Sequence, residues 1–439
     1  MKRPLALYER VLYLDGQLPV NVMIMACIRG HIAEDRMHQA LARVQAKHPI
    51  LRSLIVSEVG RPWFELQASP PPIPLRVLER QSSDAWIDAS THELLQRFDG
   101  NQQPLARLAW LRGEDESELV LICHHAVCDG LSLVTLLREI LLLCDQPDRD
   151  IGSYSTLDTF EDLVPAEVLT DRRLQRKIRR NAALLKAFLW FARPLVRQPD
   201  PDHPYGVYGK VYRNFWALDD LASRALLERC KAEGVSAFIA ISVSIMLAFR
   251  AVRGAKGAKK FQGSVDLRRY LPGLKADSLF PTSATVPLSL GRTPDGGSAE
   301  ADFWALTRMV KADMTQKIGR LGPTVYARLL ALERLHGSYG QMLALGVSRP
   351  AERPVTLSYL GRLELAEDYH DFRLQAIRGI SGMLEPSPAN LLAISSFAGR
   401  FEFSLGSDEH SLPHEQAVQI QEKAMAMLHS YTAPKAQPA

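Results

Sequence analysis

The chain has 439 residues, 46% of them hydrophobic, and its 53 Lys and Arg nearly balance 49 Asp and Glu for a net charge of +4. This length is sufficient for two globular domains of ordinary size. The net charge is too small to indicate a nucleic-acid partner, and we expect none. Five scattered cysteines lack metal or disulfide spacing, so we expect a reducing, cytoplasmic location.

The first 150 residues alternate between strand-like and helix-like patterns. Apolar runs predict strands, and apolar residues at helical spacing predict helices. The predicted strands cover 19–30, 49–56, 63–67, 73–78, 105–111 and 119–125, and the predicted helices cover 34–48, 84–97 and 131–144. This alternation is typical of an α/β domain.

The stretch 119–136 reads LVLICHHAVCDGLSLVTL. Its apolar start predicts a strand buried on both faces, which ends in His124 and His125. A turn at Asp129-Gly130 then leads into a helix. Because neighbouring strand residues point to opposite faces, His124 and His125 should have different roles. A histidine with a pKa near neutral can accept a proton from an attacking hydroxyl or amine.

The same stretch has other interpretations. The two histidines could simply end a strand. A zinc site made of His124, His125, Cys128 and Asp129 fails on geometry, because adjacent strand residues diverge, so we expect no metal. Cys128 as a nucleophile activated by His125 is a further alternative to a buried, inert thiol.

Residues 170–197 combine a basic part with an apolar and aromatic part. Arginines and lysines dominate 172–180, and Leu, Phe and Trp dominate 184–191. Such a segment could make peripheral contact with an anionic membrane through 172–191, dock an acidic carrier protein, or cover the domain with a solvated basic face. All three interpretations stay open at this point.

Four prolines between 194 and 204 predict a linker and a domain boundary. The second half predicts strands at 211–217, 355–365 and 391–405, the last with a turn at Ala398-Gly399. Helices are predicted at 219–232, 236–250, 299–318, 324–335 and 414–429, and the apolar run 237–249 has the length of a buried helix. The basic loop 254–260 could meet coenzyme A phosphates or be merely solvated. We expect the tail 433–439 to be disordered.

Three sequence features together resemble one enzyme superfamily. His124-His125-x-x-x-Asp129-Gly130 is similar to the HHxxxDG signature of thioester-dependent acyltransferases, which include condensation domains, polyketide-associated acyltransferases and alcohol acetyltransferases. Residues 47–52, KHPILR, resemble the turn that opens condensation-type domains, where His48 is structural. Residues 265–268, VDLR, resemble the (D/N)xR element. The family's glycine-asparagine step and the DFGWG element of the plant branch are absent, which disfavours that branch.

The resemblance implies an α/β (α+β) fold with two chloramphenicol acetyltransferase-like subdomains in a V-shaped pseudo-dimer. The N-terminal subdomain would be 1–195 and the C-terminal one 206–432. His125 would be the catalytic base, supported by His124, Asp129 and Gly130, with Arg268 paired to Asp129. Ser358 could help to stabilise an oxyanion or be an ordinary strand serine.

The resemblance also implies a reaction and its partners. An acyl group would pass from acyl-CoA or an acyl carrier protein to a small alcohol, lipid or amine, with coenzyme A or phosphopantetheine as part of the substrate and no permanently bound cofactor. We expect ester formation, because no adenylation or carrier module is present in the sequence, and we expect a monomer. A free-standing amide-forming condensation enzyme and a non-catalytic carrier-protein docking module are the alternatives.

Overall fold

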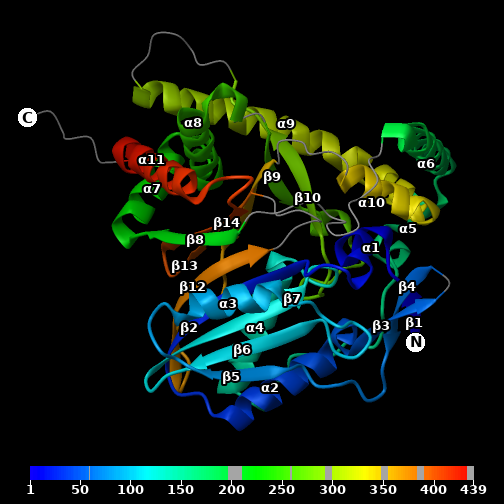
Figure 1. The fold of residues 1–439 in the computed structure, drawn as a ribbon, viewed down its shortest axis with the longest axis horizontal. Helices are drawn as coiled ribbons and strands as arrows, with labels where there is room; N and C mark the ends of the chain where they lie inside the picture. The colour runs from blue at the N-terminus through cyan, green and yellow to red at the C-terminus, as the bar shows by residue number, and fades with distance from the viewer. Residues whose placement is uncertain are drawn as a thin grey trace, which may run out of the picture.

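The computed structural model describes residues 1–58, 60–195, 210–257, 260–291, 299–347, 354–382 and 390–432. Two mixed sheets, each with its own helices, form two lobes that meet along one side (Figure 1). The first half of the chain forms one lobe and most of the second half forms the other. The two-lobed mixture of helices and sheets predicted from the sequence is confirmed. The predicted linker, 194–206, lies mostly outside the described residues, and the tail, 433–439, lies wholly outside them.

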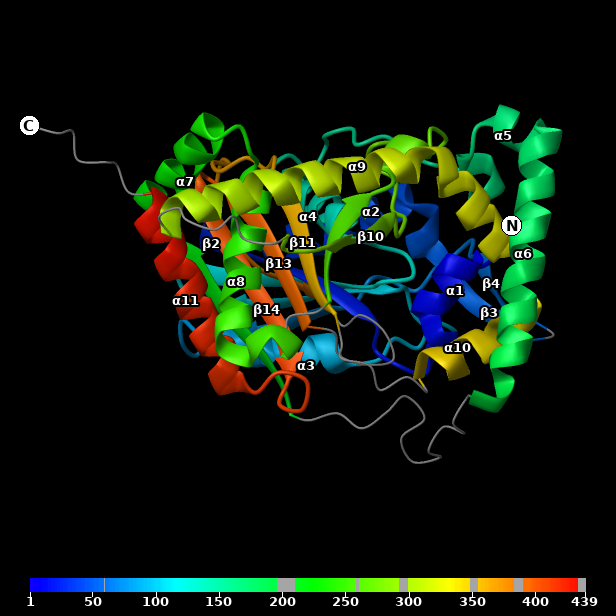
Figure 2. The same cartoon turned by 90° about the horizontal axis from the view of Figure 1, so that it is seen from above.

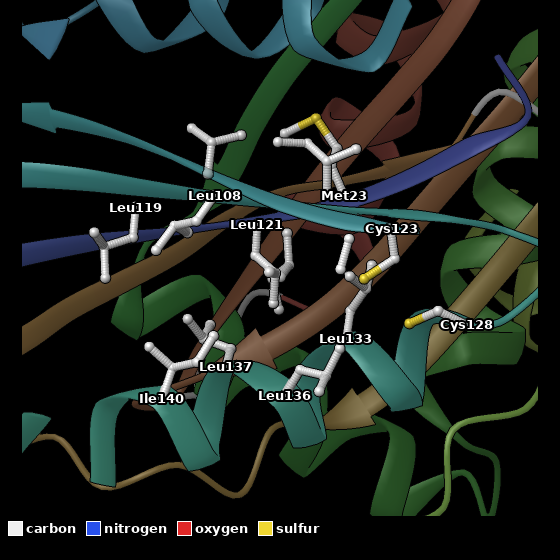
Figure 3. Close-up of a cluster of buried hydrophobic side chains, with 14 of the residues drawn as sticks. Met23, Leu108, Leu119, Leu121, Cys123, Cys128, Leu133, Leu136, Leu137 and Ile140 are labelled. Atoms are coloured by element: carbon white, nitrogen blue, oxygen red, sulfur yellow. The ribbon is translucent and has the colours of Figure 1, made fainter. Parts of the chain in front are cut away.

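The N-terminal lobe contains a five-stranded sheet in the order β12-β2-β7-β6-β5. Helices α2 and α4 pack together, and α4 and α3 both contact the sheet. Figure 3 shows Leu133, Leu136, Leu137 and Ile140 of α4 facing Leu119 and Leu121 of β7. The elements are β2 (Asn21–Gly30), α2 (Glu34–Lys47), β5 (Leu75–Glu79), α3 (Ala85–Leu95), β6 (Ala106–Arg112), β7 (Glu116–His124), α4 (Gly130–Asp145) and β12 (Phe372–Gly382).

Strand β12 was not predicted, and it crosses from the second half of the chain into the N-terminal sheet. It pairs antiparallel with β2, with register shifts at 374–376 and 378–381. Gly379 lies at one of these shifts with a φ of +64°. The shifts interrupt the alternation of apolar and polar residues, which is why the sequence pattern did not indicate a strand. A strand from the second half of the chain thus completes the sheet of the N-terminal lobe, and the two lobes do not divide at one point in the chain.

The C-terminal lobe contains a six-stranded sheet in the order β10-β9-β11-β13-β14-β8. Ala398 and Gly399 join β13 to β14 with φ values of +48° and +82°, which confirms the predicted turn. The strands are β8 (Val211–Leu218), β9 (Phe261–Asp266), β10 (Ser283–Leu288), β11 (Val355–Arg362), β13 (Asn390–Phe397) and β14 (Arg400–Asp408). The main helices are α7 (Asp220–Ala232), α8 (Ala237–Gly257), α9 (Ala299–Glu333) and α11 (His414–Thr432).

Helix α8 confirms the prediction of a buried core helix. Its window Ala237–Gly254 is apolar and long enough to cross a membrane, but 67% of it is buried. It packs against α9 and α11 inside the second lobe. The basic loop 254–260 begins within the end of this helix, and its residues 258 and 259 lie outside the described part of the chain.

Helix α9 corrects another prediction. The sequence predicted two helices, at 299–318 and 324–335, but the structure has one helix of 35 residues that runs through Gly322-Pro323. Figure 2 shows it crossing the whole molecule above the sheets. A proline inside a helix removes one hydrogen bond and bends the helix without having to end it. Burial of Val325, Ala327 and Ala331 beyond the proline stabilises the continuation.

The remaining elements surround the outer end of the first lobe. A small sheet orders its strands β1-β4-β3, and β1, α1 and α10 were not predicted. These elements are β1 (Lys2–Pro4), α1 (Leu7–Tyr13), β3 (Ser53–Glu58), β4 (Arg61–Leu66), α5 (Ala166–Thr170), α6 (Arg172–Ala192) and α10 (Tyr339–Val347). The basic and aromatic segment identified in the sequence forms one continuous helix, α6.

Candidate active site

The loop between β7 and α4 holds the two histidines at the interface between the lobes. The backbone amide of His124 donates to the carbonyl of Leu105, and that of His125 donates to the carbonyl of Val20. Asp129 caps α4, its side chain accepting from the backbone N–H of Ser132 at 2.8 Å. Backbone bonds before the loop and a helix cap after it fix the loop at both ends.

His124 is part of the protein core. Its ring lies 5.4 Å from the ring of Tyr13 and 6.2 Å from that of Phe98. Its Nδ1 accepts a hydrogen bond from the backbone N–H of Ala126 at 3.1 Å. Burial, reinforced by the nearby His125, lowers the pKa of His124 to about 3, so the ring is neutral at physiological pH. The different roles expected for the two histidines stay a prediction, and the surroundings of His124 are those of a core residue.

His125 lines a cavity. Its side chain is almost fully buried, and its Nδ1–H donates to the carbonyl oxygen of Cys128 at 2.8 Å. This bond fixes the tautomer in which Nε2 carries the lone pair, and Nε2 has no protein partner among the described residues. Burial lowers the pKa of His125, although the Cys128 carbonyl and the charge of Asp129 act in the opposite direction. His125 is thus a neutral ring with a free basic nitrogen.

The cavity beside His125 has a volume of about 140 Å³ and lies between the lobes. His125 and Gly130 come from the first half of the chain, and Ser264 and Ser358 come from strands β9 and β11 of the second. A larger cavity of about 300 Å³ is lined by residues that include His48 and Tyr154 but does not include His125. The chemistry is therefore assigned to the smaller cavity.

Two serine hydroxyls stand together on the wall formed by the second half. The Oγ of Ser264 donates to the Oγ of Ser358 at 3.2 Å, and both residues line the cavity that contains His125. Hydroxyl donors near a reacting carbonyl can stabilise the negative charge that develops on its oxygen. Ser264 was not singled out from the sequence, because the pairing of β9 with β11 brings together residues 94 positions apart.

Asp129 and Arg268 form the predicted ion pair. Arg268 Nη1 donates to Oδ2 of Asp129 at 2.8 Å, and Nη2 donates to Oδ1 at 3.0 Å. Thr282 adds hydrogen bonds to Oδ2 from its hydroxyl, at 2.7 Å, and from its backbone N–H, at 3.2 Å. The carboxyl is buried, which alone would raise its pKa, but the Arg268 guanidinium and these hydrogen bonds lower the pKa of Asp129 to about 2. Asp129 is therefore ionised, and its carboxylate has a structural role as the partner of Arg268, Thr282 and Ser132.

Gly130 allows close packing at the edge of the cavity. A Cβ atom at this position would lie 2.7 Å from Cδ2 of Leu360, which comes from β11. Leu360 also lines the cavity. The glycine thus lets the first turn of α4 approach the second lobe, and any side chain there would push Leu360.

Cys128 does not have the surroundings of a nucleophile. It is completely buried, and burial together with the neighbouring Cys123 raises the pKa of its thiol well above the usual value. A thiol of this kind stays protonated at neutral pH. The alternative in which Cys128 attacks the substrate is therefore disfavoured.

The KHPILR turn has the structural role that the sequence predicted for His48. Its Nε2 contacts Oε2 of Glu139 at 2.9 Å, and the neighbouring Lys47 contacts Oε1 of the same residue at 2.5 Å. Lys47 also reaches Asp277 of the second half. These polar contacts, which the sequence did not indicate, tie α2 to α4 and join the two lobes at a second place.

Comparison with known proteins agrees with this geometry. The family model described as Condensation domain matches residues 13–155. Cyclosporin synthetase simA of Tolypocladium inflatum is 25% identical over 262 residues, 57% of this chain and 2% of that protein. The chain thus spans only a small part of the length of the curated relatives it matches.

Solved structures share the fold over the whole chain. The first condensation domain of the calcium-dependent antibiotic synthetase, in complex with a substrate analogue, has a TM-score of 0.70 at 15% identity, covering 100% of this chain and 98% of that domain. TRI3 trichothecene 15-O-acetyltransferase from Fusarium sporotrichioides has a TM-score of 0.69 at 12% identity, covering 98% and 95%. The fold is that of two chloramphenicol acetyltransferase-like subdomains. The chain thus resembles the HHxxxDG acyltransferase superfamily in three ways: its residues 13–155 match the condensation-domain model, that segment holds the HHxxxDG residues, and the whole chain has the fold of these solved structures.

Proposed function

We propose that this protein transfers an acyl group from a thioester, carried by coenzyme A or an acyl carrier protein, to a hydroxyl group. The observation that carries the proposal is the position of His125. Its free Nε2 belongs to a neutral ring beside a cavity between the lobes, where two substrates can meet. The superfamily match supports acyl transfer or condensation in general, and the hydroxyl acceptor is the more specific part of the proposal.

The proposed reaction needs one base and no covalent enzyme intermediate. Nε2 of His125 accepts the proton of the hydroxyl while its oxygen attacks the thioester carbonyl. The resulting oxyanion is stabilised by the hydroxyl of Ser358, which accepts a hydrogen bond from Ser264 and keeps its own proton to donate. The carbon–sulfur bond then breaks, the ester forms, and the imidazolium returns the proton to the leaving thiolate. The protein supplies orientation and a proton acceptor, and the thioester supplies the leaving group.

A neutral, buried histidine suits a hydroxyl acceptor. A hydroxyl reaches nucleophilic strength only when its proton is removed during attack, whereas a free amine needs only to be unprotonated when it binds. The structural neighbour TRI3 is named as an O-acetyltransferase. The matches to peptide synthetases support an amine acceptor as the second candidate, and His125 would be the base in that reaction too.

A screen of substrates tests the proposal. Acyl-CoA and acyl-phosphopantetheine thioesters of increasing chain length are offered with panels of alcohols and amines, and free thiol and product mass are measured. We expect acceptor-dependent thiol release with an ester product. Amide products with inert alcohols would transfer the assignment to the amine-acceptor candidate. Tight binding of a loaded carrier protein with no turnover in any pair would favour the non-catalytic docking module.

The pH dependence of kcat/KM provides a separate prediction. The base must be unprotonated, and burial lowers the pKa of His125 below its ordinary value of 6.5. We therefore expect kcat/KM to stay level as the pH falls through 6.5 and to decline only at lower pH, as His125 takes up a proton. A rate profile measured between about pH 4.5 and 8 with a neutral alcohol acceptor checks this. A midpoint above 6.5 would contradict the role given to His125.

A further inference from the structure

Helix α6 has an unusual distribution of charge. Between Arg172 and Ala192 it carries seven Lys and Arg and no Asp or Glu, whereas the entire chain has a net charge of only +4. None of these seven residues forms an ion pair with an acidic side chain in the part of the chain that the structure describes. Figures 1 and 2 show the helix at one end of the molecule, on the outside of α9 and α10.

The inner face of α6 is well packed. Ile178, Ala182 and Leu189 are buried, and the first two belong to a core cluster that also contains Phe280 of the second half. The helix also contacts α9 and α10 along its length. Its position is therefore fixed by tertiary contacts, and the character of its outer face does not result from a loosely attached segment.

One stripe runs along the outer face at helical spacing. Arg173, Lys177 and Arg180 form its first half, and Leu184, Phe188 and Phe191 form its second half, all of them exposed. Residues spaced in this way lie on one side of a helix, and the stripe is about 27 Å long at 1.5 Å per residue. Cationic and apolar side chains are thus separated along the axis of the helix and not on opposite faces of it.

Two large aromatic residues lie near the end of the helix, Phe191 on the stripe and Trp190 beside it. Trp190 is 58% exposed and Phe191 is 70% exposed, and their rings contact each other edge to face at 4.8 Å between centroids. Trp190 is the only exposed tryptophan of the six in the chain. Exposing such rings to water is unfavourable unless another surface covers them, and tryptophan prefers the boundary between headgroups and hydrocarbon.

We propose that the outer face of α6 docks the protein on the surface of an anionic lipid bilayer. Phosphate groups of the lipid headgroups would pair with Arg173, Lys177 and Arg180. The rings of Phe188, Trp190 and Phe191 would enter the boundary between headgroups and acyl chains. A bilayer offers negative charge and hydrocarbon side by side over the whole length of the stripe, which matches the distribution of residues. This proposal does not rest on the proposed acyl transfer.

Other occupants fit the same face less well. In a symmetric pair of copies with antiparallel α6 helices, each basic half would lie on the partner's apolar half, and with parallel helices the basic halves would repel each other. An acidic protein would match the basic half but would also need an apolar groove for Phe188 and Phe191. A bilayer offers anionic headgroups for the basic half and hydrocarbon for the apolar half, so it fits the full stripe best.

Vesicle sedimentation with the full chain tests the proposal. Vesicles contain either phosphatidylcholine alone or phosphatidylcholine with about a third of phosphatidylglycerol. We expect binding to the anionic vesicles only, with a loss as salt is raised, because salt screens the headgroup charges. Lys177→Gln/Arg180→Gln and Leu184→Gln/Phe191→Gln should each lower the partition coefficient about tenfold or more. Brominated lipids should quench tryptophan fluorescence in the wild type but not in Trp190→Phe.

A matched control comes from helix α7. Leu221→Gln/Arg224→Gln removes one exposed apolar side chain and one exposed charge from a different helix, and binding should be unchanged. Circular dichroism and thermal unfolding confirm that all variants remain folded. The proposal is overturned if anionic vesicles do not bind, if the α6 and α7 variants behave alike, if an acidic carrier protein alone binds this face, or if the α6 variants abolish a dimer of the chain instead.

Discussion

Replacement of His125 by asparagine is expected to lower kcat by about 10²–10⁴-fold while the protein stays folded. The amide nitrogen of asparagine can occupy roughly the position of Nδ1 and keep the hydrogen bond to the carbonyl of Cys128. Nε2, the proposed base, is removed. Turnover is measured by thiol release and folding by thermal unfolding. His125→Ala should lose as much turnover and also some stability, because it leaves that buried carbonyl without its donor.

The adjacent histidine provides the control. His124 is buried against Tyr13 and Phe98 and accepts a hydrogen bond from the backbone of Ala126. His124→Asn can keep an acceptor for that N–H but leaves space beside the two rings. We therefore expect lower stability with a much smaller loss of kcat below the unfolding temperature. Equal losses of kcat in two folded variants would mean that His125 is not the base.

The local part of the site could be predicted because its information is contiguous in the sequence. An apolar run, two histidines, Asp129-Gly130 and a helical pattern follow one another within 18 residues, and each determines the conformation of the next. Asp129 is both the helix cap and the partner of Arg268. That second role, across 139 positions, was predicted only through the resemblance of residues 265–268 to a family element.

What the sequence pattern could not predict depends on contacts between distant segments. β12 joins the N-terminal sheet by pairing with the edge of β2. The two register shifts in β12 interrupt its alternation of apolar and polar residues, so the strand is not evident from the sequence. Ser264 reaches the cavity because β11 lies between β9 and β13. The contacts of Lys47 and His48 with Glu139 follow from the packing of α2 on α4. The sequence of the KHPILR turn indicates its backbone conformation, but it does not indicate which distant residues its side chains contact.

Helix α9 shows a different limit. Gly322-Pro323 is a local helix-ending signal, and it lies between the two helices predicted at 299–318 and 324–335. In the folded chain, tertiary packing on both sides of the proline outweighs the local cost, so one helix results. The prediction of two helices agrees with the low helix propensity of Gly and Pro, whereas the continuous helix results from the burial of residues beyond them.

The second large effect is expected for Arg268→Ala, which should lower the free energy of unfolding by about 3–5 kcal/mol. The substitution leaves the buried Asp129 carboxylate without its cation, although Ser132 and Thr282 still donate to it. Arg269→Ala is the matched control, because Arg269 is adjacent and exposed, and its effect should stay within about 0.5 kcal/mol. Chemical denaturation of both variants measures the difference, and similar values would show that the pair adds no stability.

Acid unfolding should report the same pair. The pKa of Asp129 is lowered from 3.8 to about 2 in the folded protein. A lowered folded-state pKa means that the pair stabilises the protein fully above pH 3.8 and that this contribution is lost as the pH falls towards 2. Without Arg268 the folded-state pKa rises, because burial then dominates. The variant should therefore lose less additional stability over this pH range than the wild type does.

The position of the pair predicts that activity falls even where the variant is folded. Asp129 ends the loop that carries His125, and Arg268 follows strand β9, which carries Ser264 on the opposite wall of the cavity. The pair thus ties the loop that carries the base to the strand that carries Ser264. Arg268→Lys keeps the charge but loses the two-pronged geometry, so it should recover part of the stability and little of kcat. If kcat recovered in proportion to stability, the pair would act on folding alone and not on the alignment of the two lobes.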